Sequence, residues 1–165
     1  MARLSAAQSA VVQLLGNMCL TKGVLAINAA SAATIKTTNA LVYTVDGVLY
    51  SKAALSAQAL TVISGGTAFY VQPVSSTVYY VVAVNAAGTV ITVQGDFTGR
   101  DLSIPYVGRG DGFVPDVPAG YTAIGMFKVV TNGSTTFTPA TTALDAAGVT
   151  VTYYDIGVLP ATKAP

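Results

Sequence analysis

The amino-acid sequence predicts a mainly β protein, an antiparallel β-sandwich or barrel with one N-terminal α-helix. All 7 acidic residues are aspartate, and glutamate, which helical surfaces commonly carry, does not occur. Val, Thr and Tyr are abundant, and these β-branched and aromatic residues fit the pleated surface of a strand. After residue 22 the apolar residues form short segments separated by Gly, Asn and Pro, which is typical of antiparallel sandwiches and barrels.

The helix is expected at residues 4–19, where apolar residues recur at steps of three and four, as on one face of a helix. Ser5 and Gln8 form a capping-box pattern at its start, whereas Gly16 and Asn17 weaken its last turn. Further apolar residues widen this face, so we expect the helix to dock on a surface and to contribute to a subunit interface. The stripe expected at that interface consists of Leu4, Ala7, Val11, Leu14 and Met18.

The chain is expected to divide into a helical arm at residues 1–22 and an antiparallel β domain at residues 23–165. A length of 165 residues suits one folded domain. Gln13, Gly16 and Asn17 interrupt the apolar run of the arm, so a signal peptide is not expected. Every apolar stretch is broken well before about 20 residues, so no membrane span is expected either.

The clearest local prediction is a β-hairpin in which residues 41–45 and 48–52 flank Asp46 and Gly47. These two residues readily take the positive φ angles that a two-residue hairpin turn requires. The other expected strands share a short, β-branched character. They cover residues 24–27, 34–37, 60–63, 68–71, 78–84, 89–93, 121–130, 135–138 and 149–154, with the fifth and sixth forming a second hairpin.

Residues 95–120 are rich in Gly and Pro and are expected to form a contact loop, because a long connection without regular structure often carries function. We expect Arg109, Asp111 and Phe113 of this loop at an interface. Arg109, Gly110 and Asp111 also spell a cell-adhesion tripeptide. Gly and Asp are ordinary turn residues, however, so turn chemistry is the simpler interpretation of the tripeptide.

The composition argues against most catalytic and binding chemistry. The chain has no histidine and one cysteine, which excludes Ser-His-Asp sites, Cys-His sites and the usual zinc sites. The aspartates of the 95–120 loop do not follow the calcium-loop pattern, and no carboxylate pair is marked out for glycoside cleavage. A net charge of +1 gives no basic field for nucleic acid. We therefore expect no enzyme activity, no cofactor, no metal and no nucleic-acid partner.

The composition instead favours self-assembly. The chain is 52% hydrophobic and 9% charged, and a small domain cannot bury all of its apolar surface. Neighbouring subunits would cover that surface in an oligomer. The pairs Tyr79-Tyr80 and Tyr153-Tyr154 should point to opposite faces of their strands. One ring of each pair would pack inward, and the other would lie at a subunit contact or remain partly exposed.

Residues 35–53, 114–125 and 128–139 resemble virion structural proteins of tailed bacteriophages. The resemblance spans most of the chain after residue 30 and includes no catalytic signature. It implies a capsid cement or decoration protein, or a piece of a head or tail fibre. Fibres usually carry long repeats or sustained heptads, and this sequence has neither, so a cement protein is the main expectation.

A cement protein of this kind would lie on the outside of the capsid, bind the major capsid protein and often form a homotrimer. Three other classes remain open: a small fibre or tail adaptor subunit, a carbohydrate-binding module and an unrecognised hydrolase. A carbohydrate-binding module commonly presents an aromatic platform to the sugar, but the chain has no tryptophan.

Overall fold

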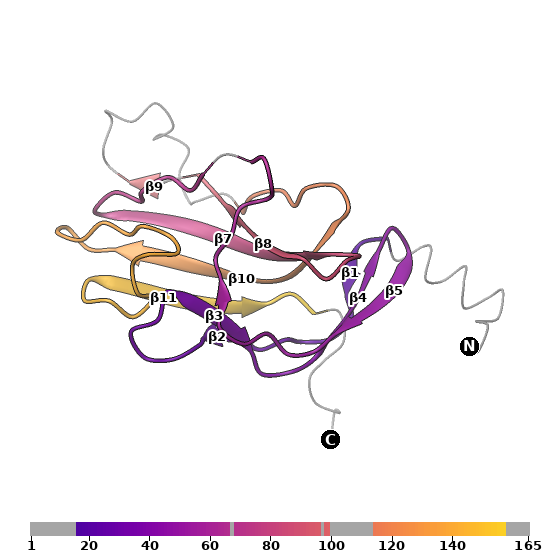
Figure 1. The fold of residues 1–165 in the computed structure, drawn as a ribbon. Helices are drawn as coiled ribbons and strands as arrows, with labels where there is room; N and C mark the ends of the chain where they lie inside the picture. Colours follow the sequence, from indigo (N-terminus) through magenta and orange to yellow (C-terminus); the bar gives the residue numbers. More distant parts are fainter. Residues whose placement is uncertain (1–15, 67, 97, 100–113, 158–165) are drawn as a thin grey trace, which may run out of the picture.

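The computed structural model describes residues 16–66, 68–96, 98–99 and 114–157, and in these residues the protein is mainly β with antiparallel sheets (Figure 1). No helix occurs within the described ranges. The strands are β1 (Met18–Cys19), β2 (Leu25–Ile27), β3 (Thr34–Thr37), β4 (Leu41–Val45), β5 (Val48–Lys52), β6 (Gln58–Ala59), β7 (Ser76–Asn85), β8 (Val90–Gln94), β9 (Thr98–Gly99), β10 (Tyr121–Thr131) and β11 (Val149–Asp155).

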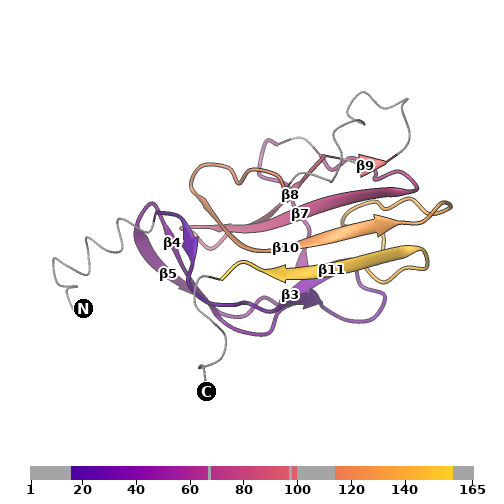
Figure 2. The same ribbon diagram turned by 180° about the vertical axis from the view of Figure 1, so that it is seen from behind.

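The main sheet has the strand order β11-β10-β7-β8, and β9 pairs with the start of β7. Its two long central strands, β7 and β10, are antiparallel, with one register shift between Ala123 and Gly125. Figure 2 shows β7, β10 and β11 side by side, with β3 behind them. The pairing of β10 with β11 runs without a shift from Gly125 to Thr131.

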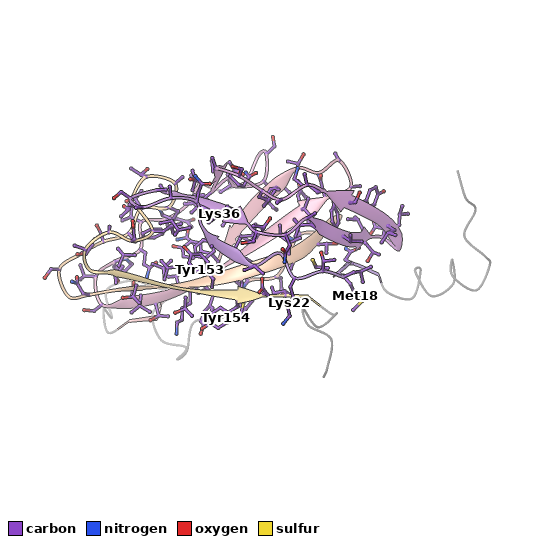
Figure 3. All side chains as sticks on the ribbon, turned by 90° about the horizontal axis from the view of Figure 1, so that it is seen from below. Met18, Lys22, Lys36, Tyr153 and Tyr154 are labelled. Atoms are coloured by element: carbon purple, nitrogen blue, oxygen red, sulfur yellow. The ribbon has the colours of Figure 1, made fainter. Side chains whose placement is uncertain are left out.

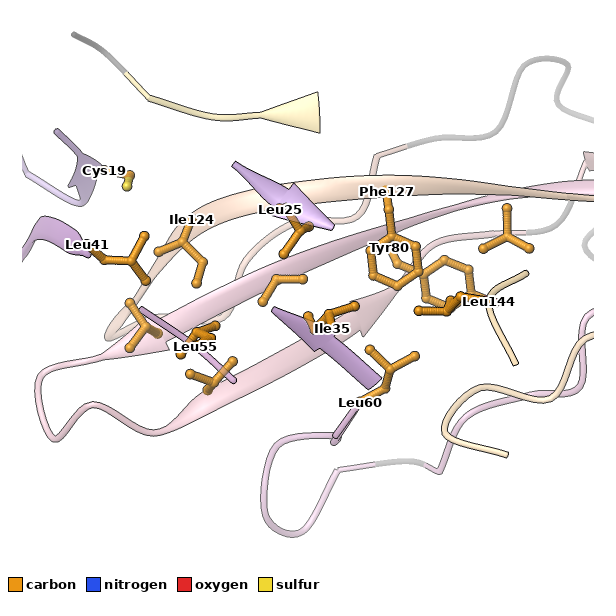
Figure 4. Packing of buried hydrophobic residues seen from close by; sticks show 14 of the residues in the cluster. Cys19, Leu25, Ile35, Leu41, Leu55, Leu60, Tyr80, Ile124, Phe127 and Leu144 are labelled. Carbon is orange, nitrogen blue, oxygen red and sulfur yellow. The ribbon is translucent and has the colours of Figure 1, made fainter. Parts of the chain in front are cut away.

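Two smaller sheets complete the described architecture. The sheet β2-β3-β6 lies across one face of the main sheet, and the sheet β1-β4-β5 lies at one end of the molecule (Figure 1). Figure 4 shows the core between the sheet β2-β3-β6 and the main sheet. Leu25 and Ile35 of the smaller sheet lie close to Phe127 and Tyr80 of the main sheet. Burial of each such apolar side chain contributes about 1.5–3 kcal/mol.

The aromatic centre of the core is built on alternate residues of the long strands. The rings of Tyr80 and Phe127 stack with their centroids 4.9 Å apart, and Phe137 meets Tyr80 edge-on at 6.0 Å. Because strand residues two apart share a face, Val78 and Val82 join Tyr80 in the same core. Val81 and Ala83 on the opposite face of β7 are buried as well, which explains why β7 reads as an almost continuous apolar run in the sequence.

Both hairpins expected from the sequence are confirmed. Asp46 and Gly47 take φ angles of 49° and 76° between β4 and β5, the left-handed pair that a two-residue turn needs. β7 and β8 form the second hairpin, with Gly88 at a φ of 79° in the connecting turn. The strands expected at 24–27, 34–37, 121–130 and 149–154 also occur, with small differences at their ends.

Three expected strands are wrong, because their backbone groups bond to turns, side chains or single residues and not to a neighbouring strand along their length. In 60–63, the Thr61 carbonyl accepts from the Thr92 N–H, and the Ile63 carbonyl accepts from the Gly66 N–H in a turn. In 68–71, the Gln94 side chain bonds both the N–H and the C=O of Tyr70. Before 135–138, Asn132 Oδ1 accepts bonds from the N–H groups of Ser134 and Thr135 and turns the chain, and the segment keeps a single bridge between Phe137 and Gln72.

The helix expected at residues 4–19 was predicted to extend too far toward the C-terminus. Residues 1–15 lie outside the described residues, but Met18 and Cys19 form β1 and pair with Thr44 and Tyr43 of β4. Gly16 has a positive φ of 57°, a conformation that breaks a right-handed helix. Asn17 Oδ1 then accepts a bond from the Asp46 N–H at 2.6 Å. Met18 therefore belongs to a sheet and not to a helical stripe, and β1 joins part of the expected arm to the β body.

Candidate functional site

Two aspartates of the described residues, Asp145 and Asp155, bind backbone N–H groups. Asp155 Oδ1 accepts bonds from the N–H groups of Val24 at 2.8 Å and Leu25 at 3.3 Å, which ties the end of β11 to β2. Both carboxylate oxygens of Asp145 accept a bond from the Ser31 N–H. No group of three His, Cys, Asp or Glu residues that could hold a metal ion occurs in the described part of the chain.

The single cysteine is part of the core. Cys19 is buried, and its thiol donates a hydrogen bond to the Thr21 carbonyl at 3.0 Å. Burial raises the pKa of the Cys19 thiol above its ordinary value. A buried, protonated thiol is a poor nucleophile, so Cys19 contributes packing.

Among the residues that the structure describes, none belongs to a helix of sufficient length and apolar character to cross a membrane.

One apolar surface lies at the end of the β4–β5 hairpin, and we call it the hairpin-end surface. It consists of Val48 and Leu49, which are 53% and 47% exposed. The Gly47 N–H donates to the Gly16 carbonyl at 3.2 Å, so the described chain begins beside this surface. Leu4, Ala7, Val11 and Leu14 of the expected stripe lie outside the described residues, in the segment that precedes Gly16.

A second apolar surface lies on the segment between β6 and β7, and we call it the Tyr70 surface. It consists of Tyr70, Val71 and Val74, with Tyr70 61% and Val71 54% exposed. The amide of Gln94 holds this segment, because it bonds the N–H of Tyr70 at 2.8 Å and the C=O of Tyr70 at 2.9 Å. The aromatic ring is therefore displayed from a fixed backbone.

The two tyrosine pairs divide between opposite faces as expected. Tyr80 is fully buried, and Tyr79 is half-buried on the other face of β7. Tyr153 packs against the core, with its ring 6.1 Å from that of Phe127. Figure 3 shows Tyr153 and Tyr154 on opposite sides of β11. The outer rings, those of Tyr79 and Tyr154, are half-buried. A subunit contact at these rings therefore stays a prediction, beside the simpler interpretation of partial exposure.

The structure brings together little of the interface expected from the sequence. Met18 is half-buried in β1, and Arg109, Asp111 and Phe113 lie outside the described residues. Of the 95–120 loop, β9 pairs with β7, and the described residues after it begin at Val114, which is exposed. The sequence reasoning missed Val48 and Leu49. Their signal was two adjacent apolar residues on one strand, since a strand that is buried on one face should expose only one of them.

Comparison of the chain with protein-family models, with curated proteins and with solved structures finds no match.

Proposed function

We propose that this protein is a non-enzymatic structural protein of a phage particle. In this proposal it binds the outside of the capsid as a homo-oligomer and stabilises the shell by bridging neighbouring subunits of the major capsid protein. The scaffold would be a β-sandwich, preceded by a helix within residues 4–15. Support comes from the resemblance of three segments to virion proteins and from the structural roles of Asp145, Asp155 and Cys19.

The observation that carries the proposal is the hairpin-end surface. Val48 and Leu49 are about half exposed on a rigid two-residue hairpin, beside the point where the N-terminal segment joins β1. Apolar burial contributes about 25 cal/mol per Å², so a contact of several hundred Å² provides many kcal/mol before the entropy of association is subtracted. A contact of this kind depends little on charge and should resist salt.

The test places two charges on this surface. We expect Val48→Asp with Leu49→Asp to release the protein from particles and to lower the temperature at which the particles burst, because buried carboxylates are costly. The control is Ser134→Asp with Thr136→Asp, two exposed residues that follow the end of β10 farthest from the β7–β8 turn, which should keep full occupancy. Val11→Asp with Leu14→Asp should act like the first variant if the N-terminal segment shares the contact.

Occupancy of purified particles and their thermal stability measure the outcome. Full occupancy and an unchanged bursting temperature for Val48→Asp with Leu49→Asp would contradict the proposal. Particle imaging separates a cement protein on the shell from a small fibre or adaptor subunit.

The Tyr70 surface supports a second candidate, a carbohydrate-binding module. An exposed ring on a fixed backbone can stack on a sugar, and Tyr70 is 61% exposed. Glycan-array binding by the isolated protein that Tyr70→Ala abolishes would favour this function over capsid binding.

A further inference from the structure

The two edges of the main sheet differ in how they are closed, and the edge at β8 is covered by the chain itself. The Thr92 N–H donates to the Thr61 carbonyl at 2.7 Å, and the Thr61 hydroxyl donates to the Val90 carbonyl at 3.0 Å. The Gln94 side chain bonds the backbone of Tyr70 next to it. Two outward backbone groups of β8, the Thr92 N–H and the Val90 carbonyl, therefore have partners, and the segment that holds Thr61 and Tyr70 lies along this edge.

Among the described residues, no strand pairs with the other edge, β11. The Asn132 N–H donates to the Gly148 carbonyl at 2.9 Å, which extends the β10–β11 register by one pair. Bonded and non-bonded pairs alternate in an antiparallel ladder, so Thr150, Thr152 and Tyr154 exchange hydrogen bonds with β10. Val151 and Tyr153 then direct their backbone N–H and C=O groups away from the sheet. The N–H of Val149 follows this alternation, because it donates outward to the Ala146 carbonyl.

The sequence of β11 carries none of the usual protection of an edge. Natural edge strands are commonly short, bulged, or guarded by Lys or Pro. β11 has seven residues without Lys, Pro or Gly, and its pairing with β10 has no bulge. Its one charge, Asp155, stands at the end of the strand and is bonded to the N–H groups of Val24 and Leu25. By contrast, the open edge strand β5 is shorter and ends at Lys52.

We propose that β11 pairs with β11 of a second copy of this chain, antiparallel, about a two-fold axis at Thr152. Val151 of one copy then lies opposite Tyr153 of the other, so the outward N–H and C=O groups of both residues are bonded. Thr152 faces Thr152, and both are exposed and uncharged in the single chain. The closed β8 edge disfavours the alternative of pairing β11 with β8, which would give an open polymer or a ring.

The pairing joins the two main sheets into one continuous sheet. It also covers the exposed parts of Val151 and Tyr153, which pack against the core with only part of their surface. This self-association does not depend on capsid binding. It gives a dimer, whereas the resemblance to cement proteins implies a trimer.

The first test removes one outward donor. The N–H of Val151 is not used by β10, so Val151→Pro deletes a bond of the dimer and spares the bonds to β10. The matched control, Val151→Ala, shortens the same side chain and keeps the N–H. In sedimentation at micromolar concentration, the unaltered protein and Val151→Ala should be dimers. Val151→Pro should be a folded monomer by circular dichroism, with a dissociation constant raised on the order of ten-fold or more, since symmetry removes two bonds.

The second test uses the residue on the two-fold axis and does not depend on proline. Thr152→Lys and Thr152→Asp each place like charges opposite one another, so each variant alone should shift toward monomer. An equal mixture of the two should recover the dimer, because opposite charges then face each other. Thr89→Lys, at an exposed site on the far side of the sheet, should leave the dimer intact. A monomeric unaltered protein would overturn the proposal, and so would a dimer or trimer whose mass none of the β11 changes alters.

Discussion

One buried side chain joins the segment before β7 to the two central strands of the main sheet, β7 and β10. Gln72 is fully buried, and its Nε2 donates to the carbonyls of Ser76 at 3.2 Å and Val129 at 3.0 Å. Its Oε1 accepts a bond from the Tyr80 hydroxyl at 3.2 Å. Every polar atom of this amide is used, so the irregular segment before β7 is bonded to both central strands.

Gln72→Leu should therefore destabilise the fold. The apolar side chain leaves buried carbonyl groups with fewer partners, which costs about 1–3 kcal/mol. The control is Gln58→Leu, since the Gln58 amide bonds only the neighbouring Ala59 carbonyl at the surface, and it should change stability by less than about 0.5 kcal/mol. Urea unfolding of both variants measures the difference. Equal stability of the two variants would show that the Gln72 bonds add nothing.

Tyr153 makes the stability depend on pH in the alkaline range. Burial, and then the nearby Asp145, raise the pKa of Tyr153 to about 12 from 10.0. The unfolded chain loses this proton near pH 10, while the folded chain keeps it. The stabilising contribution is therefore complete below pH 10 and is lost as the pH rises through 12.

The expected result is a free energy of unfolding that falls between pH 10 and pH 12, with a shallower fall in Tyr153→Phe. Burial also raises the pKa values of Tyr43 and Tyr80, so part of the slope should persist in that variant. Urea unfolding across this range measures the slope. An identical slope with and without the Tyr153 hydroxyl would contradict the assignment.

At the scale of elements, turn chemistry was the most informative part of the sequence. Asp46 and Gly47 define their hairpin because few residue pairs accept two positive φ angles in succession. The segments 68–71 and 135–138 have the same apolar, β-branched character as true strands. They do not become strands because the Gln94 side chain bonds the backbone of Tyr70, and Asn132 Oδ1 accepts a bond from the Thr135 N–H.

The candidate surfaces were harder to predict than the strands. The apolar character of Val48 and Leu49 is visible in the sequence, but their exposure depends on what the rest of the described chain leaves uncovered on the two faces of β5. Likewise, the open edge of β11 follows from the strand order, which hydrophobic pattern alone does not determine. Met18 was assigned to a helix because its spacing fits the stripe, although Gly16 and Asn17 end any such helix before it.

At the scale of the whole molecule, the proposed surfaces occupy different places. The β4–β5 hairpin lies at one end, and β11 follows one margin of the main sheet (Figure 1). Antiparallel pairing of two β11 strands would direct the two hairpin ends in opposite directions. A dimer with a contact surface at each end suits a protein that bridges neighbouring subunits of a shell.

The most direct measurement of the central proposal is the position of this chain in intact phage particles, determined by electron cryo-microscopy. We expect density for the β domain at regular positions on the outer surface of the capsid, with the β4–β5 hairpin against the shell. Absence of the chain from particles, or its presence only in the tail or in fibres, would contradict a role in stabilising the capsid.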